Sequence, residues 1–278
     1  MATFVKNCTL DLFSHLHSFE LCSFGSGSSG NCYFVGNAES ALLVDAGLNG
    51  RNIVKALQES GKNIRQIQGI LITHDHIDHI KGLPDLTQRF NVPVYVTARS
   101  WEAILNNRYT RNVRPGCIRI IEAEKPFHIG SFSITPFPVD HDAADAHGFH
   151  ISNSHSSLSI ATDLGTINPI AEKYLKASHF MVLESNYDEQ MLREGPYPQY
   201  LQDRIRSNKG HLSNDQTADF LSKNHHPNLK QVFLAHLSEH NNSPEKVTES
   251  LQNIMNGNQH LFQFTVLERK KRSVIFRL

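Results

Sequence analysis

The sequence predicts an α/β fold of four layers, in which two mixed β-sheets pack face to face and helices cover their outer sides. Short apolar or alternating stretches, typical of strands, alternate with helical patterns along both halves of the chain. No linker, repeat or low-complexity tract divides the 278 residues, of which 39% are hydrophobic. We therefore expect one αββα domain over residues 20–278, preceded by an N-terminal extension over residues 1–19.

The first half of the chain supplies five predicted strands and two predicted helices. The strands lie near residues 20–24, 32–35, 41–45, 69–73 and 94–97, and the helices near 51–60 and 82–90. The second half is richer in helices, several of which begin at Asn or Ser caps. Its strands lie near residues 132–139, 148–152, 157–162, 180–183 and 232–235, and its helices near 169–177, 198–207, 214–223 and 244–256.

The C-terminus predicts a last pair of strands over 262–267 and 273–276. The basic run from Arg269 to Arg272 lies between them, and we interpret it as a solvated hairpin turn rather than a patch for nucleic acid.

A histidine-rich motif follows the strand predicted at 69–73, in the segment GILITHDHIDHIKG. His74 and His76 lie two apart, so in extended chain both imidazoles point the same way and can bind one ion. Asp78 and His79 follow after the chain has turned, and they can face a second ion. Imidazole and carboxylate suit zinc, manganese or iron. An ordered H-x-H-x-D-H after an apolar strand is far more specific than a polar loop that happens to be rich in histidine, so the motif predicts a dinuclear metallohydrolase.

Four more segments place a single acidic residue or histidine near the end of a predicted strand: Asp45, His141, Asp163 and His236. Together with the H-x-H-x-D-H loop, these segments resemble the five ordered motifs of the metallo-β-lactamase-fold hydrolases. The resemblance implies seven metal ligands. His74, His76 and His141 would bind the first metal, Asp78, His79 and His236 the second, and Asp163 would bridge them. Asp45 would orient the ligands from behind.

Further segments, covering the chain from Leu21 onward, resemble the YycJ (WalJ) subgroup of this family. They include FGSGSSGN at 24–31, HDAAD at 141–145, LESN at 183–186 and GHLSN at 210–214. Members of the subgroup are regarded as 5′ to 3′ exonucleases on DNA, so the resemblance implies a nuclease with two divalent ions, zinc or manganese or else iron, and a nucleic acid substrate. His147 departs from the subgroup, which has an apolar residue or proline there.

The site predicts hydrolysis by a metal-bound hydroxide, because a water shared by two metals ionises near pH 7. His211 resembles a histidine thought to assist the leaving group in tRNA 3′-processing endonucleases, and Glu184 could orient it. A loop histidine hydrogen-bonded to backbone explains His211 equally well. We expect Asp78, His211 and Glu184 to act in catalysis. Ser28, Ser29, Asn31 and Asn186 are candidate substrate contacts, although the Gly25–Gly30 loop has the stronger interpretation of a turn between strands.

Composition narrows the class of protein. Equal numbers of basic and acidic residues, 27 of each, argue against affinity dominated by phosphate neutralisation, although two bound ions would supply local positive charge. The four cysteines have no C-x-x-C spacing, which suits a cytoplasmic protein, and no apolar run is long enough to span a membrane. His15 and His17 lack further ligands, and we assign them to the N-terminal extension.

Rival functions differ in their ligands. By family resemblance, a flavodiiron oxidoreductase would have Glu in place of His76, and a zinc β-lactamase would have Cys in place of Asp163. A thioester or lactone hydrolase of the glyoxalase II or lactonase kind uses the same ligands and remains the alternative enzyme. A binding module without catalysis would have lost ligands that this chain keeps. The stretch from Asp163 to His236 is too short for the inserted domain of the β-CASP nucleases.

Overall fold

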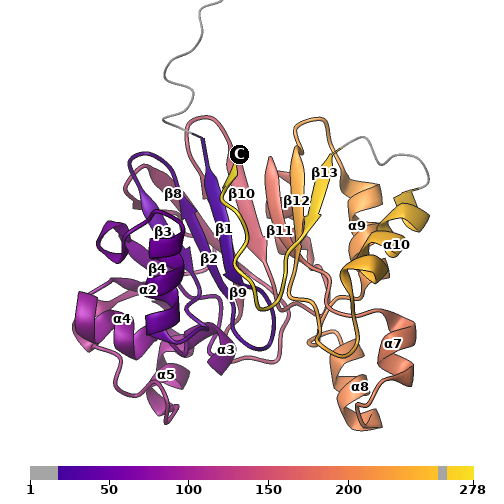
Figure 1. Ribbon diagram of the computed structural model, residues 1–278, viewed down its shortest axis with the longest axis horizontal. Coiled ribbons are helices and arrows are strands. Elements are labelled where there is room, and N and C mark those ends of the chain that lie inside the picture. The colour runs from indigo at the N-terminus through magenta and orange to yellow at the C-terminus, as the bar shows by residue number, and fades with distance from the viewer. Residues whose placement is uncertain (1–17, 256–261) are drawn as a thin grey trace, which may run out of the picture.

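Two seven-stranded sheets form the centre of the computed structural model, which describes residues 18–255 and 262–278 (Figure 1). Sheet A contains, in spatial order, β14 (Phe276–Arg277), β1 (Glu20–Gly25), β2 (Cys32–Gly36), β3 (Ala41–Val44), β4 (Gly69–Leu71), β5 (Val94–Thr97) and β6 (Ile118–Ile121). Sheet B contains β13 (Gln263–Val266), β12 (Gln231–Ala235), β11 (Phe180–Glu184), β10 (Ser157–Ala161), β9 (His147–Ser152), β8 (Phe132–Pro138) and β7 (Phe127–Ile129).

Helices cover the outer face of each sheet, as the αββα prediction requires (Figure 1). Sheet A carries α2 (Gly50–Glu59), α4 (Leu83–Phe90) and α5 (Ala98–Asn106), and sheet B carries α6 (Pro169–Lys176), α9 (Asn214–Asn224) and α10 (Pro244–Met255). A one-turn helix, α3 (Ile77–Ile80), and the pair α7 (Glu189–Glu194) and α8 (Gln199–Arg206) lie at one end of the molecule. Short 3₁₀ turns lie at Ile64–Gln66 and Pro115–Cys117. The expected caps are present: Asn168 accepts hydrogen bonds at the start of α6, and Ser213 closes a capping box on α9.

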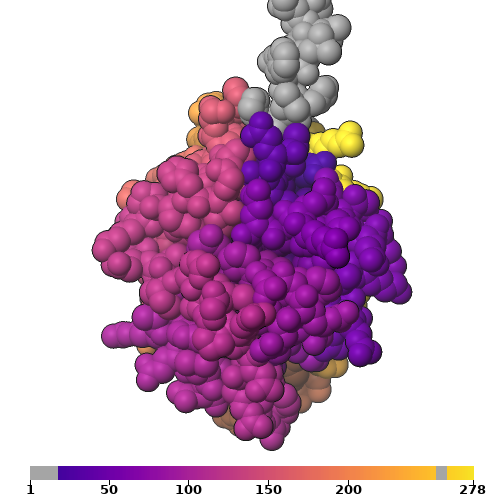
Figure 2. Space-filling model, turned by 90° about the vertical axis from the view of Figure 1, so that its left-hand side faces the viewer, coloured from indigo at the N-terminus to yellow at the C-terminus, as the bar shows by residue number. Residues whose placement is uncertain are grey.

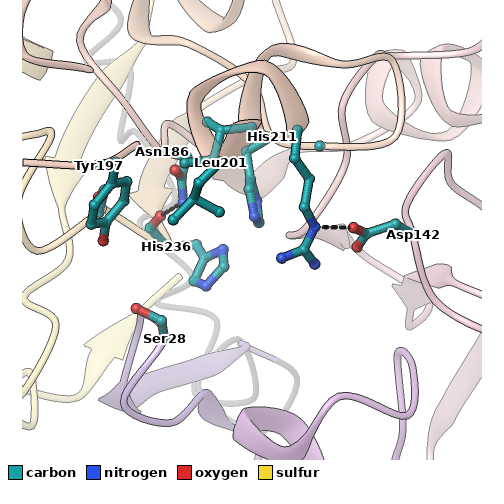
Figure 3. Close-up of a pocket in the computed structure, with 11 residues that line it drawn as sticks. Ser28, Asp142, Asn186, Tyr197, Leu201, His211 and His236 are labelled. Atoms are coloured by element: carbon teal, nitrogen blue, oxygen red, sulfur yellow. Dashed lines mark hydrogen bonds and ion pairs between the residues drawn. The ribbon is translucent and has the colours of Figure 1, made fainter. Parts of the chain in front are cut away.

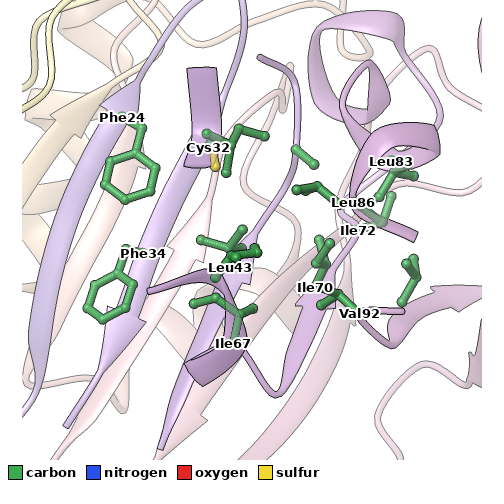
Figure 4. Packing of buried hydrophobic residues seen from close by; sticks show 14 of the residues in the cluster. Phe24, Cys32, Phe34, Leu43, Ile67, Ile70, Ile72, Leu83, Leu86 and Val92 are labelled. Carbon is green, nitrogen blue, oxygen red and sulfur yellow. The ribbon is translucent and has the colours of Figure 1, made fainter. Parts of the chain in front are cut away.

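Three apolar layers hold this sandwich together. Strand β3 reads ALLV and is buried on both faces: Leu42 packs between the sheets, and Leu43 packs outward under the helices. This double burial explains why the strand is a continuous apolar run rather than an alternating one. Figure 4 shows the outer layer of sheet A, where Leu43, Ile70 and Ile72 lie near Leu83 and Leu86. Figure 2 shows the flank of the molecule on which the first half of the chain, indigo to magenta, forms most of the surface.

The C-terminal strands correct one prediction. Strand β13 pairs with β12 in sheet B, whereas β14 pairs with β1 in sheet A, so the segment between them crosses from one sheet to the other and is not a hairpin turn. The pattern also failed to predict α5, α7, β6 and β7, and it predicted the turn at Asp78 and His79 without the one-turn helix α3. Helix α10 was predicted as far as Asn256, which lies outside the described residues, as do His15 and His17. Within the described ranges, no helix has the length and apolar character needed to cross a bilayer.

Parallel pairing brings the predicted site residues to one edge of the sandwich. Strands β3 to β6 run parallel in sheet A, and β10 to β13 run parallel in sheet B. The carboxyl ends of parallel strands meet at the same edge, where α/β proteins place their ligands. Asp45, Asp163 and His236 lie directly after β3, β10 and β12 or one residue beyond them. All three have left-handed backbones, with φ of 62°, 61° and 56° respectively, so the chain turns sharply at each of them.

Gly47, in the turn after β3, lies against the backbone of the histidine loop after β4. A Cβ built on Gly47 would lie 1.6 Å from the carbonyl oxygen of Asp78. Neighbouring backbone bonds fix this approach, because Ala46 N–H donates to the carbonyl of His79 and Asn31 N–H donates to that of Asp78, at 2.7 and 2.8 Å. Only glycine leaves room for the histidine loop to lie against the turn after β3.

We predict that Gly47→Ala lowers the free energy of unfolding by about 2 kcal/mol or more, because rigid backbone atoms must move to admit the methyl group. Gly116→Ala is the matched control, since a Cβ at Gly116 meets no atom within 4 Å. Denaturant melts of the two variants provide the measurement, and equal stability of both would contradict the close approach.

Candidate metal centre

The H-x-H-x-D-H loop adopts the shape that its spacing predicts. His76 lies immediately before α3 in extended conformation, and α3 then turns the chain so that Asp78 and His79 face a different direction. The rings of His74 and His76 lie 4.6 Å apart between centroids, and each lies 5.0 Å from the ring of His141. One nitrogen from each of these three rings lies within 4.8 Å of the others, which is the spacing of a shared ion.

A second group adjoins the first. Asp78, His79 and His236 also have potential ligand atoms within 4.8 Å of one another. Asp163 lies between the two groups: its Oδ2 is 3.3 Å from His79 Nε2, and its Oδ1 is 3.8 Å from His141 Nε2. The structure therefore brings together all seven predicted ligands, with the carboxylate of Asp163 near residues of both groups.

The ligand atoms themselves fit metal ions. His74 Nε2, His236 Nε2 and Asp163 Oδ2 are buried and have no hydrogen-bond partner among the described residues. Buried polar atoms are normally satisfied, so unpaired atoms within the two candidate ligand groups fit sites for bound ions. Each of the two rings uses its other nitrogen for the protein, since His74 Nδ1 contacts Thr73 Oγ1 at 3.0 Å and His236 Nδ1 contacts Glu184 Oε1 at 2.8 Å. Imidazole nitrogens with a carboxylate are a donor set for divalent ions.

Asp45, which follows β3, contacts the candidate ligand His79 and the residue before His74. It is fully buried, and its Oδ2 lies 2.7 Å from His79 Nδ1. It also accepts hydrogen bonds from the N–H of Thr73 and from its hydroxyl, both at 2.9 Å. Thr73 then contacts His74, so one carboxylate fixes a ligand of each metal group. Thr73 was not among the predicted site residues, although its hydroxyl next to His74 was a visible signal.

Glu184, at the end of β11, contacts histidine rings in the same way from sheet B. Its Oε1 lies 2.8 Å from the Nδ1 atoms of both His211 and His236. Its Oε2 accepts from the N–H groups of Leu164 and Leu212 at 3.0 and 3.2 Å. Burial acts to raise the pKa of Glu184, but the adjacent His211 and the hydrogen bond from His236 outweigh burial and bring that pKa to about 2. Glu184 is thus an ionised carboxylate that holds both rings.

Neighbouring carboxylates raise the pKa values of His236 and His79. Burial lowers the pKa of His236, but Asp163 and Glu184 outweigh burial and raise the pKa to about 9. Burial also lowers the pKa of His79, which Asp163, Asp45 and Asp78 hold well above its ordinary value. Burial raises the pKa of Asp163, but His236 and His79 keep it well below its usual range. Without ions, protons therefore balance the buried negative charge, and divalent ions would replace them.

The candidate substrate residues divide into two groups. Ser28 and Asn186 line a cavity of about 190 Å³ beside His211 and His236, where Asn186 also donates to the carbonyl of His236 at 2.7 Å (Figure 3). Ser29 is exposed in the same loop but does not line this cavity. Asn31 is buried, and its amide lies 2.9 Å from His79 Nε2, so it faces the ligands rather than open space. His147 is buried at the start of β9, where its backbone N–H donates to the backbone carbonyl of Thr73.

The beta-lactamase superfamily domain model matches residues 41–236, a span that runs from β3 to His236. The chain belongs to the beta-lactamase superfamily. It is 34% identical to Exodeoxyribonuclease YycJ of Bacillus anthracis, over 83% of this chain and 86% of that protein. It is 33% identical to Exodeoxyribonuclease WalJ of Streptococcus pneumoniae serotype 2, over 82% of this chain and 84% of that protein.

These relatives confirm the predicted family and its YycJ subgroup. A solved structure of the metallo-β-lactamase fold protein YhfI from Bacillus subtilis is similar in fold, with a TM-score of 0.70 at 13% identity, covering 92% of this chain and 99% of that one. The predicted αββα fold is therefore confirmed. The superfamily and the histidine clusters also support metal-dependent hydrolysis by this chain with divalent ions.

We predict that His76→Ala lowers the metal content of the purified protein from two ions per chain toward one, because the first group then keeps only two imidazoles. His128→Ala is the control, since His128 is an exposed histidine on β7. Elemental analysis after dialysis measures both variants. Equal metal content in wild type and His76→Ala would contradict the assignment of His76 as a ligand.

Proposed function

We propose that this protein is a metal-dependent exodeoxyribonuclease that degrades DNA from 5′ to 3′. The observation that carries the proposal is the hydrogen bond of His211 to Glu184 beside the ligand groups, because phosphodiester cleavage needs a proton donor for its leaving oxygen as well as a nucleophile. The names of the relatives, both exodeoxyribonucleases, support DNA as the substrate.

The metal site would be filled by two divalent ions, zinc or manganese or else iron. We assign the first to His74, His76 and His141, the second to Asp78, His79 and His236, and the bridge to Asp163. Bound there, the ions would supply Lewis acidity and make a coordinated water acidic near neutral pH. Asp45 and Glu184 would keep the ligand nitrogens facing the ions.

His211 would act on the leaving group. Its Nδ1 is held by Glu184 at 2.8 Å, which leaves Nε2 for the substrate, and its ring is 20% exposed at the cavity. The carboxylate at Nδ1 fixes the orientation of the ring, so Nε2 is the nitrogen that can give a proton to the substrate. As the bond between phosphorus and the 3′-oxygen breaks, that oxygen would take the proton from Nε2. This geometry favours a catalytic role over that of a loop histidine bonded to backbone, because the partner of the ring is a buried carboxylate.

A thioester or lactone hydrolase is the alternative, since it would use the same ligands.

We also propose that the protein works in the cytoplasm, where the buried cysteines that form no disulfide, Cys22, Cys32 and Cys117, would stay reduced.

We expect the purified protein, supplied with manganese, to release mononucleotides from linear 5′-phosphorylated DNA. The assay includes 5′-hydroxyl DNA, RNA of the same sequence and lactoylglutathione as parallel substrates. His76→Ala should lose the activity and His128→Ala should keep it. Robust cleavage of lactoylglutathione with inert nucleic acids would overturn the nuclease in favour of the thioesterase.

His211→Ala should slow DNA cleavage by roughly 10² to 10⁴-fold, the usual contribution of a general acid. The same variant should cleave thymidine 5′-(p-nitrophenyl) phosphate almost as fast as wild type, because p-nitrophenolate leaves without being protonated. Steady-state rates on the two substrates, with His128→Ala as control, measure the difference. An equal loss on both substrates would mean that His211 does not act on the leaving group.

A further inference from the structure

The cavity beside the metal centre adjoins only one part of it. Its lining includes His211 and His236, whereas His74 and His76 do not reach it. Figure 3 shows Tyr197 at one end of the cavity and Asp142 at the other, with the two histidines between them. With a volume of about 190 Å³ it is smaller than the roughly 300–1,000 Å³ of pockets that take drug-sized ligands. Its size therefore suits one small unit of a polymer rather than several.

The position of His211 indicates which part of the DNA substrate would enter the cavity. This inference rests on the proposed function. In 5′ to 3′ cleavage the leaving 3′-oxygen belongs to the terminal nucleotide. If His211 protonates that oxygen, the terminal nucleotide lies on the side of the metal centre that His211 occupies. The cavity is the space on that side.

The lining has the chemistry of a nucleotide site. Tyr197, Leu201 and Ile205 form an apolar wall that is part of the small core between α7 and α8. The ring of Tyr197 is held edge-on by His240, with 5.8 Å between centroids. Aromatic faces of this kind bind nucleobases of any sequence. Ser28 and Asn186, which also line the cavity, offer polar groups for the sugar and phosphate.

One ion pair spans the end of the cavity away from Tyr197. Arg204 extends from α8, and its Nε donates to Asp142 Oδ2 at 2.5 Å. Asp142 follows β8, next to His141, and its other oxygen lies 3.5 Å from His141 Nε2. The pair thus ties α8 to the loop that carries a predicted metal ligand, across 62 positions of sequence. A DNA strand that continued past the terminal nucleotide toward this end would have to displace the pair.

We infer that the Arg204–Asp142 ion pair and the Tyr197 wall close the two ends of a pocket for a single terminal nucleotide, and so restrict cleavage to DNA ends. Removing the pair opens one end. The enzyme would then accept a strand that passes through the pocket, cut within it, and release longer fragments.

The test compares a linear 5′-phosphorylated single strand with a covalently closed circle of the same sequence, in manganese. Wild type should reduce the linear strand to mononucleotides and leave the circle intact. Arg204→Met, which keeps the unbranched stem of the side chain but removes the guanidinium, should nick the circle roughly tenfold faster than the background seen with wild type and release di- and trinucleotides from the linear strand. Arg206→Met is the matched control: Arg206 is on the same helix, pairs with Glu189 and does not line the cavity.

The outcomes separate this inference from the proposed function. Circle resistance and mononucleotide products in Arg204→Met would overturn the inference, as would a wild type that cuts circles as readily as linear DNA. A wild type inert on both DNAs but active on lactoylglutathione would instead overturn the proposed function. The side chain of Arg204 is 57% exposed, and Arg204→Lys, which keeps the charge, provides a second folded variant with an expected intermediate product length.

Discussion

Two buried carboxylates, Asp45 and Glu184, hold the rings on which the metal centre depends. Each is completely buried, and each contacts histidine Nδ1 atoms from the side away from the cavity. An imidazole with one nitrogen fixed in this way can present only the other nitrogen to an ion or a substrate. Glu184 also couples two tasks, because it holds His236 among the candidate ligands and His211 beside the cavity. The same oxygen therefore orients both a candidate metal ligand and the proposed proton donor.

The fold supplies these contacts by ending parallel strands at one edge. Each sheet contributes residues just beyond its strands, and left-handed turns at Asp45, Asp163 and His236 redirect the chain so that the side chains converge. Such backbone is unfavourable for residues with a side chain, and hydrogen bonds hold it here: Asp45 N–H donates to the carbonyl of Leu71, and His236 N–H donates to Ser26 Oγ. These three turns lie at the candidate site.

Sequence was sufficient for the features that depend on local order. The H-x-H-x-D-H spacing predicted the turn at α3, and apolar runs predicted most strands to within two residues. The sequence was insufficient to predict features that depend on contacts between segments far apart in the chain. The separation of β13 and β14 into different sheets depends on pairing with β12 and β1, and adjacent position suggested a hairpin instead. The Arg204–Asp142 pair likewise has no signal in the sequence, because only the approach of α8 to the loop after β8 creates it.

We propose that the seven converging candidate ligands and His211 act together on one phosphodiester. Anomalous X-ray diffraction from crystals grown with manganese and a nonhydrolysable phosphorothioate dinucleotide would locate the ions and the substrate in one experiment. We expect two manganese peaks, one among His74, His76 and His141 and one among Asp78, His79 and His236, with the phosphorothioate between them and its 3′-oxygen facing His211. A single peak, or a dinucleotide bound away from His211, would contradict it.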